Sequence, residues 1–194
     1  LVEQIILAGE LMMSDEERAP YLDFYSQNNV SPVLNQGMDE NLIKVRSALY
    51  SQLGISHLNI KGLNVLEFGP GNGTNSLYTM SLQPENYVLV DGNPLGIENC
   101  KKNFETCFPN ENWKLVESRI ENYRDKNRYE LVICEGLIPN QISPSLMVKY
   151  VAQFVAKDGT IIISCHDPVS LLSENLRALL GVLLISPGDE FQTK

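Results

Sequence analysis

The stretch NVLEFGPGNGT at residues 64–74 decides the fold. Its first five residues form an apolar run that carries one acid, Glu67, and glycines follow at Gly69, Gly71 and Gly73. A short apolar run bounded by glycines is typical of a buried strand. Alternate glycines let the backbone turn sharply and approach a ligand where a side chain would collide. The stretch therefore predicts a strand that ends in a ligand-binding loop.

The segment after the glycines indicates what kind of ligand the loop holds. Residues 74–80 are expected to begin a helix, whose first free N–H groups attract negative charge, so a nucleotide-type pocket follows. A dinucleotide fingerprint reads G-x-G-x-x-G, whereas here the glycines fall as G-x-G-x-G and Thr74 stands at the third glycine position. Glu67 would repel a pyrophosphate but suits a cationic group. The spacing thus speaks against a dinucleotide.

A second acid follows a second apolar run. The sequence YVLVD at residues 87–91 predicts a strand that ends at Asp91, about 20 residues beyond the glycine loop. An acid at this distance can accept hydrogen bonds from ribose hydroxyls. Residues 94–107 have apolar side chains at helical spacing, as a crossover helix requires. An alternative is that Asp91 caps a helix in another doubly wound fold.

The pattern E-x-G-x-G-x-G at residues 67–73 resembles motif I of the class I S-adenosylmethionine-dependent methyltransferases, and Asp91 resembles their motif II. ELVICEG at 130–136 is similar to motif IV, and DGTIIIS at 158–164 to the next strand, with Asp-Gly as its preceding turn. The resemblance implies a doubly wound, mainly parallel α/β sheet, the Rossmann-like methyltransferase fold. We expect strands near 63–68, 87–91, 113–117, 130–135 and 160–165, in the order 3-2-1-4-5.

The resemblance also implies S-adenosylmethionine as the cofactor, lying over the glycine loop with Asp91 on its ribose. The implied cofactor-binding residues are Glu67, Gly69, Pro70, Gly71, Asn72, Gly73, Asp91, Gly92, Asn93, Arg119, Ile120, Glu135 and Gly136. The family often has an acid where Arg119 stands, to accept from the adenine amino group. Arg119 cannot accept, so a backbone carbonyl or Glu121 would do so instead. Ile120 would lie against the purine.

Two residues are candidates for catalysis, and both follow apolar strands on the side where open sheets bind ligands. They are Glu135 and His166. Methyl transfer depends largely on positioning, and a base is required only when the acceptor arrives protonated. His166 is a candidate general base. The alternative is that His166 caps the following helix. Neighbouring residues on a strand point to opposite faces, so no relay with Asp167 is implied. No metal site is expected.

The chain is expected to have two parts, an N-terminal helical lid segment at 1–58 and a cofactor-binding domain at 59–194. Apolar residues within 5–12 predict a short helix, and residues 41–53 predict a longer one. Methyltransferases of small molecules often carry such helices as a lid.

Tyr25 and Arg46 of the lid segment are candidates to contact cofactor or substrate. The equally good alternative is an aromatic side chain packed on the sheet and a surface arginine. At the other end, we expect further strands beyond residue 194, because the apolar run at 160–165 would otherwise lie near an exposed edge.

Composition narrows the function classes. The 194 residues have 43% hydrophobic content, enough for one substantial core, and a net charge of −9, which predicts no general attraction to nucleic acid. The four cysteines show no metal-ligand spacing and favour a reducing, cytoplasmic setting, and no apolar run could span a membrane. We expect methyl transfer to a small molecule or biosynthetic intermediate. The alternatives are a nicotinamide-dependent oxidoreductase and a non-methylating S-adenosylmethionine-binding protein, and the acceptor and oligomeric state stay open.

Overall fold

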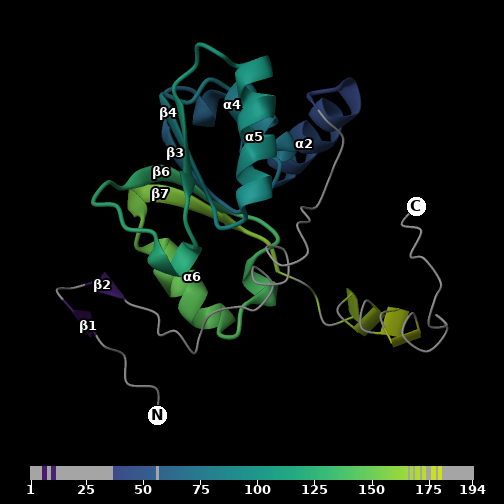
Figure 1. The fold of residues 1–194 in the computed structure, drawn as a ribbon, viewed down its shortest axis with the longest axis vertical. Helices are drawn as coiled ribbons and strands as arrows, with labels where there is room; N and C mark the ends of the chain where they lie inside the picture. The colour runs from purple at the N-terminus through teal and green to yellow at the C-terminus, as the bar shows by residue number, and fades with distance from the viewer. Residues whose placement is uncertain are drawn as a thin grey trace. The chain divides into compact units, whose positions relative to one another are not determined.

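The computed structural model describes residues 6–7, 10–11, 37–55, 57–165, 167, 169–170, 172–173, 176–177 and 179–180. The chain divides into two compact units, Leu1–Ser164 and Cys165–Lys194. The first unit carries the sheet and is shown with the rest of the chain in Figure 1.

A five-stranded parallel sheet forms the centre of the first unit. Its strands are β3 (Asn64–Phe68), β4 (Asn86–Asp91), β5 (Trp113–Glu117), β6 (Tyr129–Cys134) and β7 (Val155–Ile163). They lie in the order β5-β4-β3-β6-β7, and every neighbouring pair is parallel. This arrangement confirms the predicted fold class and the predicted order 3-2-1-4-5.

Helices cover both faces of the sheet, with α2, α4 and α5 on one side and α6 on the other (Figure 1). Their bounds are α2 (Glu40–Gln52), α3 (His57–Ile60), α4 (Thr74–Ser81), α5 (Pro94–Cys107) and α6 (Pro144–Ala152). Two short 3-10 helices, η2 (Ile120–Asn122) and η3 (Ile138–Asn140), follow β5 and β6.

The alternation of side chains along the strands creates two cores. On β3, Val65 packs with α2, α4 and α5, whereas Leu66 and Phe68 pack with α6. This is the period of two that a strand imposes. Glu67 falls on the Val65 side, so its carboxyl group faces the layer that contains α2 and α4. The position of this acid is therefore fixed by the pleat of β3.

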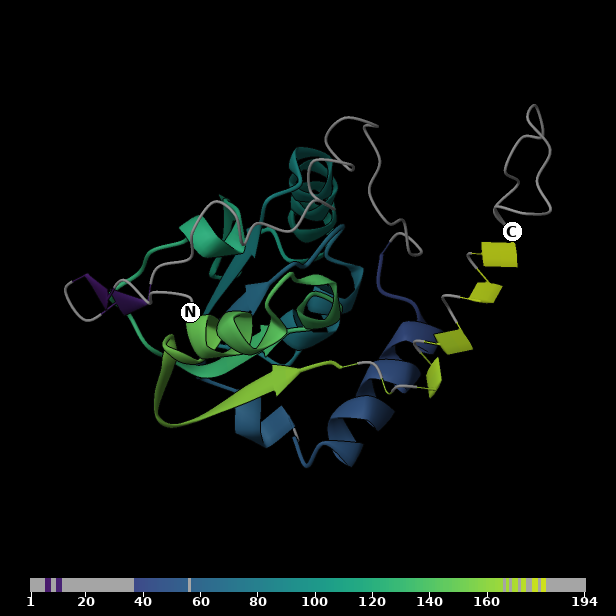
Figure 2. The same cartoon turned by 90° about the horizontal axis from the view of Figure 1, so that it is seen from below.

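The last strand differs from the sequence-based expectation. We predicted a turn at Asp158-Gly159 followed by a strand at 160–165, but β7 begins at Val155 and runs through both residues. The pairing with β6 shifts register between Tyr129 and Leu131, and Asp158 has a φ of +63°. Four residues of β7 lie opposite one residue of β6 between these pairs, so Asp-Gly lies in an irregular stretch within the strand, where it tolerates positive φ as it would in a turn. Figure 2 shows β7 at the edge of the sheet.

The short helix predicted within residues 5–12 is also wrong. Two short strands, β1 (Ile6–Leu7) and β2 (Glu10–Leu11), pair antiparallel there. The helix predicted at 41–53 is confirmed as α2, which begins at Glu40 because Asp39 accepts a hydrogen bond from the N–H of Leu42 at 2.7 Å. The boundary between a lid segment and a cofactor domain at residues 58 and 59 stays a prediction.

In the second unit, the described residues between 169 and 180 are helical. Asp167 precedes them and accepts hydrogen bonds from the N–H groups of Val169 at 3.0 Å and Ser170 at 3.1 Å, as an N-terminal cap does. Among the described residues, no helix has both the length and the apolar character that crossing a membrane requires.

Candidate functional site

The order of the strands predicts a ligand site, which we call the crevice, at the carboxyl edge of the sheet. From β3 the chain moves outward to β4 and β5, then returns to β6 on the opposite side of β3 and continues to β7. The direction of winding therefore reverses between β3 and β6. In open α/β sheets, ligands bind outside the carboxyl ends of the strands at such a reversal. The glycine loop follows β3 and Glu135 follows β6, so both flank this point.

The three glycines of the loop have different reasons to be glycine. All have positive φ, at +72° for Gly69, +57° for Gly71 and +77° for Gly73. A Cβ on Gly69 or Gly73 would collide with Leu137 or Cys100, so packing within the protein requires these two. A Cβ on Gly71 would meet no atom within 4 Å. Gly71 therefore exposes open backbone at the crevice, where a ligand can approach closely.

Asp91 holds the glycine loop in place through hydrogen bonds. Its Oδ2 accepts a hydrogen bond from the Gly71 N–H at 2.9 Å, and its Oδ1 accepts one from the Asn93 N–H at 2.8 Å. The side chain of Asn93 in turn caps α5 through the N–H of Leu95 at 3.1 Å. Burial raises the pKa of Asp91, and the backbone N–H donors oppose that rise. Because each carboxylate oxygen has further lone-pair capacity, Asp91 can hold the loop and still accept from a ligand hydroxyl.

A chain of polar contacts lies beneath the crevice, on the α2 side of the sheet. We call it the buried polar cluster, made of Arg46, Tyr50, Glu67, Thr79, Tyr87 and Glu135. Arg46 donates from both terminal nitrogens to Glu135, at 2.8 and 2.9 Å, and is only 6% exposed. It also donates to the hydroxyl of Tyr50 at 3.3 Å, which lies 2.7 Å from Thr79 Oγ1.

The other end of the buried polar cluster is Glu67, which is 7% exposed and accepts a hydrogen bond from the hydroxyl of Tyr87. Burial raises the pKa of Glu67 to about 7, and the Tyr87 hydroxyl works against that rise. Burial would lower the pKa of Arg46, but the hydrogen bond to Glu135 and the nearby charge outweigh it, so that pKa is raised. Arg46 therefore keeps its charge beside Glu135, and the pKa of Glu67 lies near neutrality.

Two buried polar atoms of this region have no hydrogen-bond partner among the described residues: Nε of Arg46 and Oγ of Ser76. Ser76 lies in the first turn of α4 and faces Glu67, whose pKa it lowers, without closing a well-aligned hydrogen bond. Buried donors are normally satisfied.

The corner after β5 carries a second ion pair. Arg119 donates from Nε to Glu121 at 2.8 Å, and Glu121 is buried. Ile120 between them is buried against Val90 and Phe68. The alternative acceptor predicted for the adenine amino group, Glu121, therefore already accepts from Arg119 and has one carboxylate oxygen outside that bond.

The structure brings together most of the predicted site residues. The glycine loop, Asp91, Asn93 and Glu135 lie at the ends of adjacent strands, and Gly136 has a φ of +73° with open space where a Cβ would stand. The Gly136 N–H donates to Ser164 Oγ at 2.6 Å. His166 and Tyr25 lie outside the described residues, so their predicted roles stay predictions.

Sequence reasoning missed three members of the buried polar cluster: Tyr50, Thr79 and Tyr87. Tyr87 is the first residue of the predicted second strand, and it pairs in register with Val65, on the face that Glu67 shares. The pairing of Tyr87 with Val65 could have indicated the contact between Tyr87 and Glu67. The other two lie on helices, and no local pattern marks them as polar partners.

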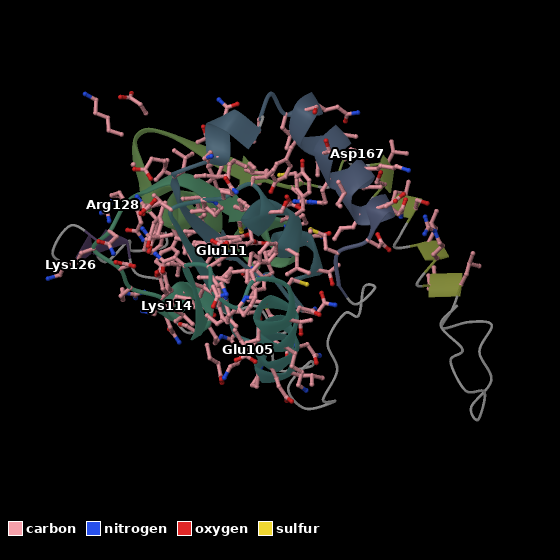
Figure 3. All side chains as sticks on the ribbon, turned by 90° about the horizontal axis from the view of Figure 1, so that it is seen from above. Glu105, Glu111, Lys114, Lys126, Arg128 and Asp167 are labelled. Atoms are coloured by element: carbon pink, nitrogen blue, oxygen red, sulfur yellow. The ribbon has the colours of Figure 1, made fainter. Side chains whose placement is uncertain are left out.

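A separate cavity of about 480 Å³ lies at the opposite, amino edge of the sheet. Its rim includes Lys114 and Arg128, and Figure 3 shows their side chains on the outside of the ribbon. The asparagines there bond to one another: Asn112 donates to Asn86, and Asn86 donates to Asn64 at 2.6 Å. These polar groups largely satisfy each other, so the carboxyl edge is the better candidate site.

The fold is similar to solved methyltransferase structures. A magnesium protoporphyrin IX methyltransferase from Synechocystis, with bound S-adenosylmethionine, is 13% identical with a TM-score of 0.60, over 80% of this chain and 83% of that one. A methyltransferase from Geobacter sulfurreducens in complex with S-adenosylhomocysteine is 16% identical with a TM-score of 0.54, over 76% of this chain and 55% of that one.

A third similar structure is a coclaurine N-methyltransferase bound to N-methylheliamine and S-adenosylhomocysteine. It is 15% identical with a TM-score of 0.53, over 62% of this chain but only 35% of that one. The chain therefore spans about a third of one relative and about half of another. No family model matches the sequence, and no curated protein matches it. The likeness shows the fold: this chain has the Rossmann-like fold of the class I S-adenosylmethionine-dependent methyltransferases.

Proposed function

We propose that this chain binds S-adenosylmethionine at the carboxyl edge of its sheet and transfers the methyl group to a small-molecule acceptor. The observation that carries the proposal is the open backbone at Gly71, held by Asp91 at the point where the winding of the sheet reverses. The positive φ of Gly71 itself favours glycine at this position. The open space beside Gly71, at the predicted ligand edge of the sheet, leaves room for a ligand to pack against the backbone.

The residues present fit this cofactor. Asp91 would accept from the ribose hydroxyls, and Glu121 or a backbone carbonyl would accept from the adenine amino group. The Nε of Arg46, a buried donor with no hydrogen-bond partner among the described residues, would donate to the carboxylate of the methionine part. The nearby Glu67 and Glu135 would favour its ammonium and sulfonium groups.

When bound, S-adenosylmethionine supplies an electrophilic methyl group on a positively charged sulfur. The protein then contributes mainly by orienting the acceptor in line and by keeping water away. Glu135 would have to lose its bidentate ion pair with Arg46 to act as a base, which makes it better suited to positioning. His166 stays the candidate base, and an acceptor that arrives without a proton needs none.

The partner that we propose is a small molecule. The solved neighbours include a porphyrin and an alkaloid-type methyltransferase by their names, and the net charge of −9 disfavours nucleic acid. All four cysteines are free thiols, two of them buried, which fits the reducing conditions of the cytoplasm.

Calorimetric titration of the protein with S-adenosylmethionine, S-adenosylhomocysteine and NAD tests the proposal. We expect the first two to bind and NAD not to bind, because the acid Glu67 directly precedes the glycine loop and Thr74 replaces the third glycine of a dinucleotide loop. Binding of NAD alone would favour the oxidoreductase alternative. Binding of S-adenosylmethionine without methyl transfer to any of a panel of small hydroxyl, amine and thiol compounds would favour a non-methylating binding protein.

A second measurement concerns the base. If His166 removes a proton from the acceptor, His166→Ala should lower turnover roughly 100-fold while cofactor affinity stays unchanged. A near-normal turnover number would remove His166 from the mechanism and leave positioning as the main contribution of the protein.

A further inference from the structure

The buried polar cluster contains one basic side chain, Arg46, and two acidic ones, Glu67 and Glu135. Arg46 and Glu135 form a bidentate pair and cancel each other's charge. Glu67 is the remaining carboxyl group, and its nearest hydrogen-bond donor among the described residues is the neutral hydroxyl of Tyr87. An ionised Glu67 therefore gives the cluster one net negative charge in a site that is almost closed to solvent. A protonated Glu67 leaves it neutral.

The titratable and charged groups that face Glu67 come from four elements and the loop after β6. They are Arg46 and Tyr50 of α2, Tyr87 of β4, Cys100 of α5, Cys134 of β6 and Glu135. Burial raises the pKa of each tyrosine and of both thiols, so none of these four loses a proton near neutrality. The pKa of Glu67, raised to about 7, by contrast places its change of charge close to neutrality.

The location of Glu67 gives this change of charge a consequence. Glu67 lies on β3 just before the glycine loop, opposite Ile133 of β6, and Glu135 lies two residues beyond Ile133. The two acids therefore flank the reversal point where the reacting end of a ligand is expected. A ligand cation that enters there favours the ionised form of a nearby carboxyl group.

We propose that Glu67 releases its proton when a cationic cofactor enters, and that it thereby makes the site prefer S-adenosylmethionine to the demethylated product. This inference rests on the proposed function of the same site. S-adenosylmethionine carries a sulfonium, an ammonium and a carboxylate, for a net charge of +1, whereas S-adenosylhomocysteine has a neutral sulfur and a net charge of zero. Only the first complements a cluster with one net negative charge. The released proton passes to the solvent, and loss of the methyl group reverses the preference and favours product release.

Calorimetry at pH 7 in buffers of different ionisation enthalpy measures the protons released on binding. For the parent protein we expect roughly half a proton per S-adenosylmethionine, because a group with a pKa of about 7 is half protonated at this pH. S-adenosylhomocysteine should release clearly less. Glu67→Gln should abolish the difference between the two ligands and reduce the preference for S-adenosylmethionine roughly tenfold.

Two further variants keep the test decisive if Glu67→Gln folds poorly. Tyr87→Phe removes a donor that lowers the pKa of Glu67, so proton release should rise from half toward one. Glu130→Gln changes a carboxyl group at the far, amino edge, where Glu130 accepts from the Asn64 N–H at 2.8 Å, and should release protons like the parent.

The outcomes separate the inference from the function on which it rests. Equal proton release with both ligands, or release that persists in Glu67→Gln, would overturn the inference and leave the proposed function intact. Failure of the parent protein to bind either ligand would overturn both. Release that depends on Glu67 and is larger for S-adenosylmethionine supports the inference.

Discussion

At the scale of single residues, Gly71 offers the sharpest test of the candidate site. Gly71→Val adds a branched side chain into space that is open in the structure, at a φ of +57° that such a residue adopts only with strain. We expect S-adenosylmethionine binding to be lost while the sheet forms normally. Calorimetry measures the binding, and far-ultraviolet circular dichroism measures the fold.

Gly62 provides the matched control for Gly71. It precedes β3 at the amino edge, its φ is +79°, and a Cβ there also meets no atom within 4 Å. Gly62→Val therefore carries a comparable backbone strain far from the crevice and should leave binding unchanged. If both variants bind S-adenosylmethionine like the parent, the loop does not cradle the cofactor.

Asp91 supports a second prediction at this scale. Asp91→Ala removes the acceptor of two backbone N–H groups, those of Gly71 in the loop and of Asn93 just before α5, together with the proposed ribose acceptor. Binding of S-adenosylmethionine should weaken by roughly 1.5–3 kcal/mol, measured by calorimetry. Glu130→Ala, which removes a carboxylate that accepts from a backbone N–H at the opposite edge, is the control. An unchanged affinity in Asp91→Ala would contradict the assignment of the ribose corner.

Site residues could be predicted from the sequence where they directly follow a strand. The glycine loop and Asp91 could be predicted because the end of a strand and a fixed spacing place them together. The ion pair between Arg46 and Glu135 could not, because the two residues are 89 positions apart and only the packing of α2 on the sheet joins them. From the sequence, Arg46 could therefore be either a site residue or a surface residue.

At the scale of elements, the prediction was accurate where the hydrophobic spacing agrees with the residues that begin or end an element. The strand at 113–117 and the helix at 94–107 match β5 and α5 in both bounds, and Asn93 with Pro94 explains the start of that helix. The start of β7 was missed because Asp-Gly is typical of a turn between elements and here lies within an irregular stretch of the strand. The hairpin of β1 and β2 was missed because the spacing of apolar residues in a short run does not distinguish a helix from a strand.

Helix α2 provides a prediction at this scale, because a few long-range polar contacts hold it to the sheet. Arg46→Ala leaves Glu135 without its partner and removes the guanidinium that stacks on Tyr50 at 5.0 Å. Because Glu135 is partly exposed, we expect a loss of roughly 1–3 kcal/mol in the free energy of unfolding, measured with urea.

A double-mutant cycle with Glu135→Gln isolates the ion pair in α2 docking. The double variant should be less destabilised than the sum of the two single variants, because removing both partners leaves no unpaired charge. Strict additivity would mean that Arg46 and Glu135 do not stabilise the docking of α2 through each other.

At the scale of the whole molecule, stability should depend on pH through Glu67. Its pKa is raised from 4.5 to about 7 on folding, so between these values the folded protein holds a proton that the unfolded chain has released. The stability that this proton gives is complete below pH 4.5 and is lost as the pH rises through about 7. The contribution is roughly 3 kcal/mol. Urea unfolding across this pH range should therefore show a smaller decline in Glu67→Gln than in the parent, and equal declines would contradict the assignment.

Ligand binding should stabilise the folded state as a whole, because the crevice is built from the ends of several elements. A cofactor that binds only the folded protein adds about 2.7 kcal/mol when its concentration is 100 times its dissociation constant. For a chain of 194 residues this corresponds to an increase in melting temperature of roughly 5–10 °C. Differential scanning calorimetry should show this increase with S-adenosylmethionine but not with NAD, and not with either ligand in Gly71→Val. Because the glycine loop joins β3 to α4 and Asp91 joins that loop to α5, an increase that survives in Gly71→Val would place the bound ligand elsewhere on the molecule.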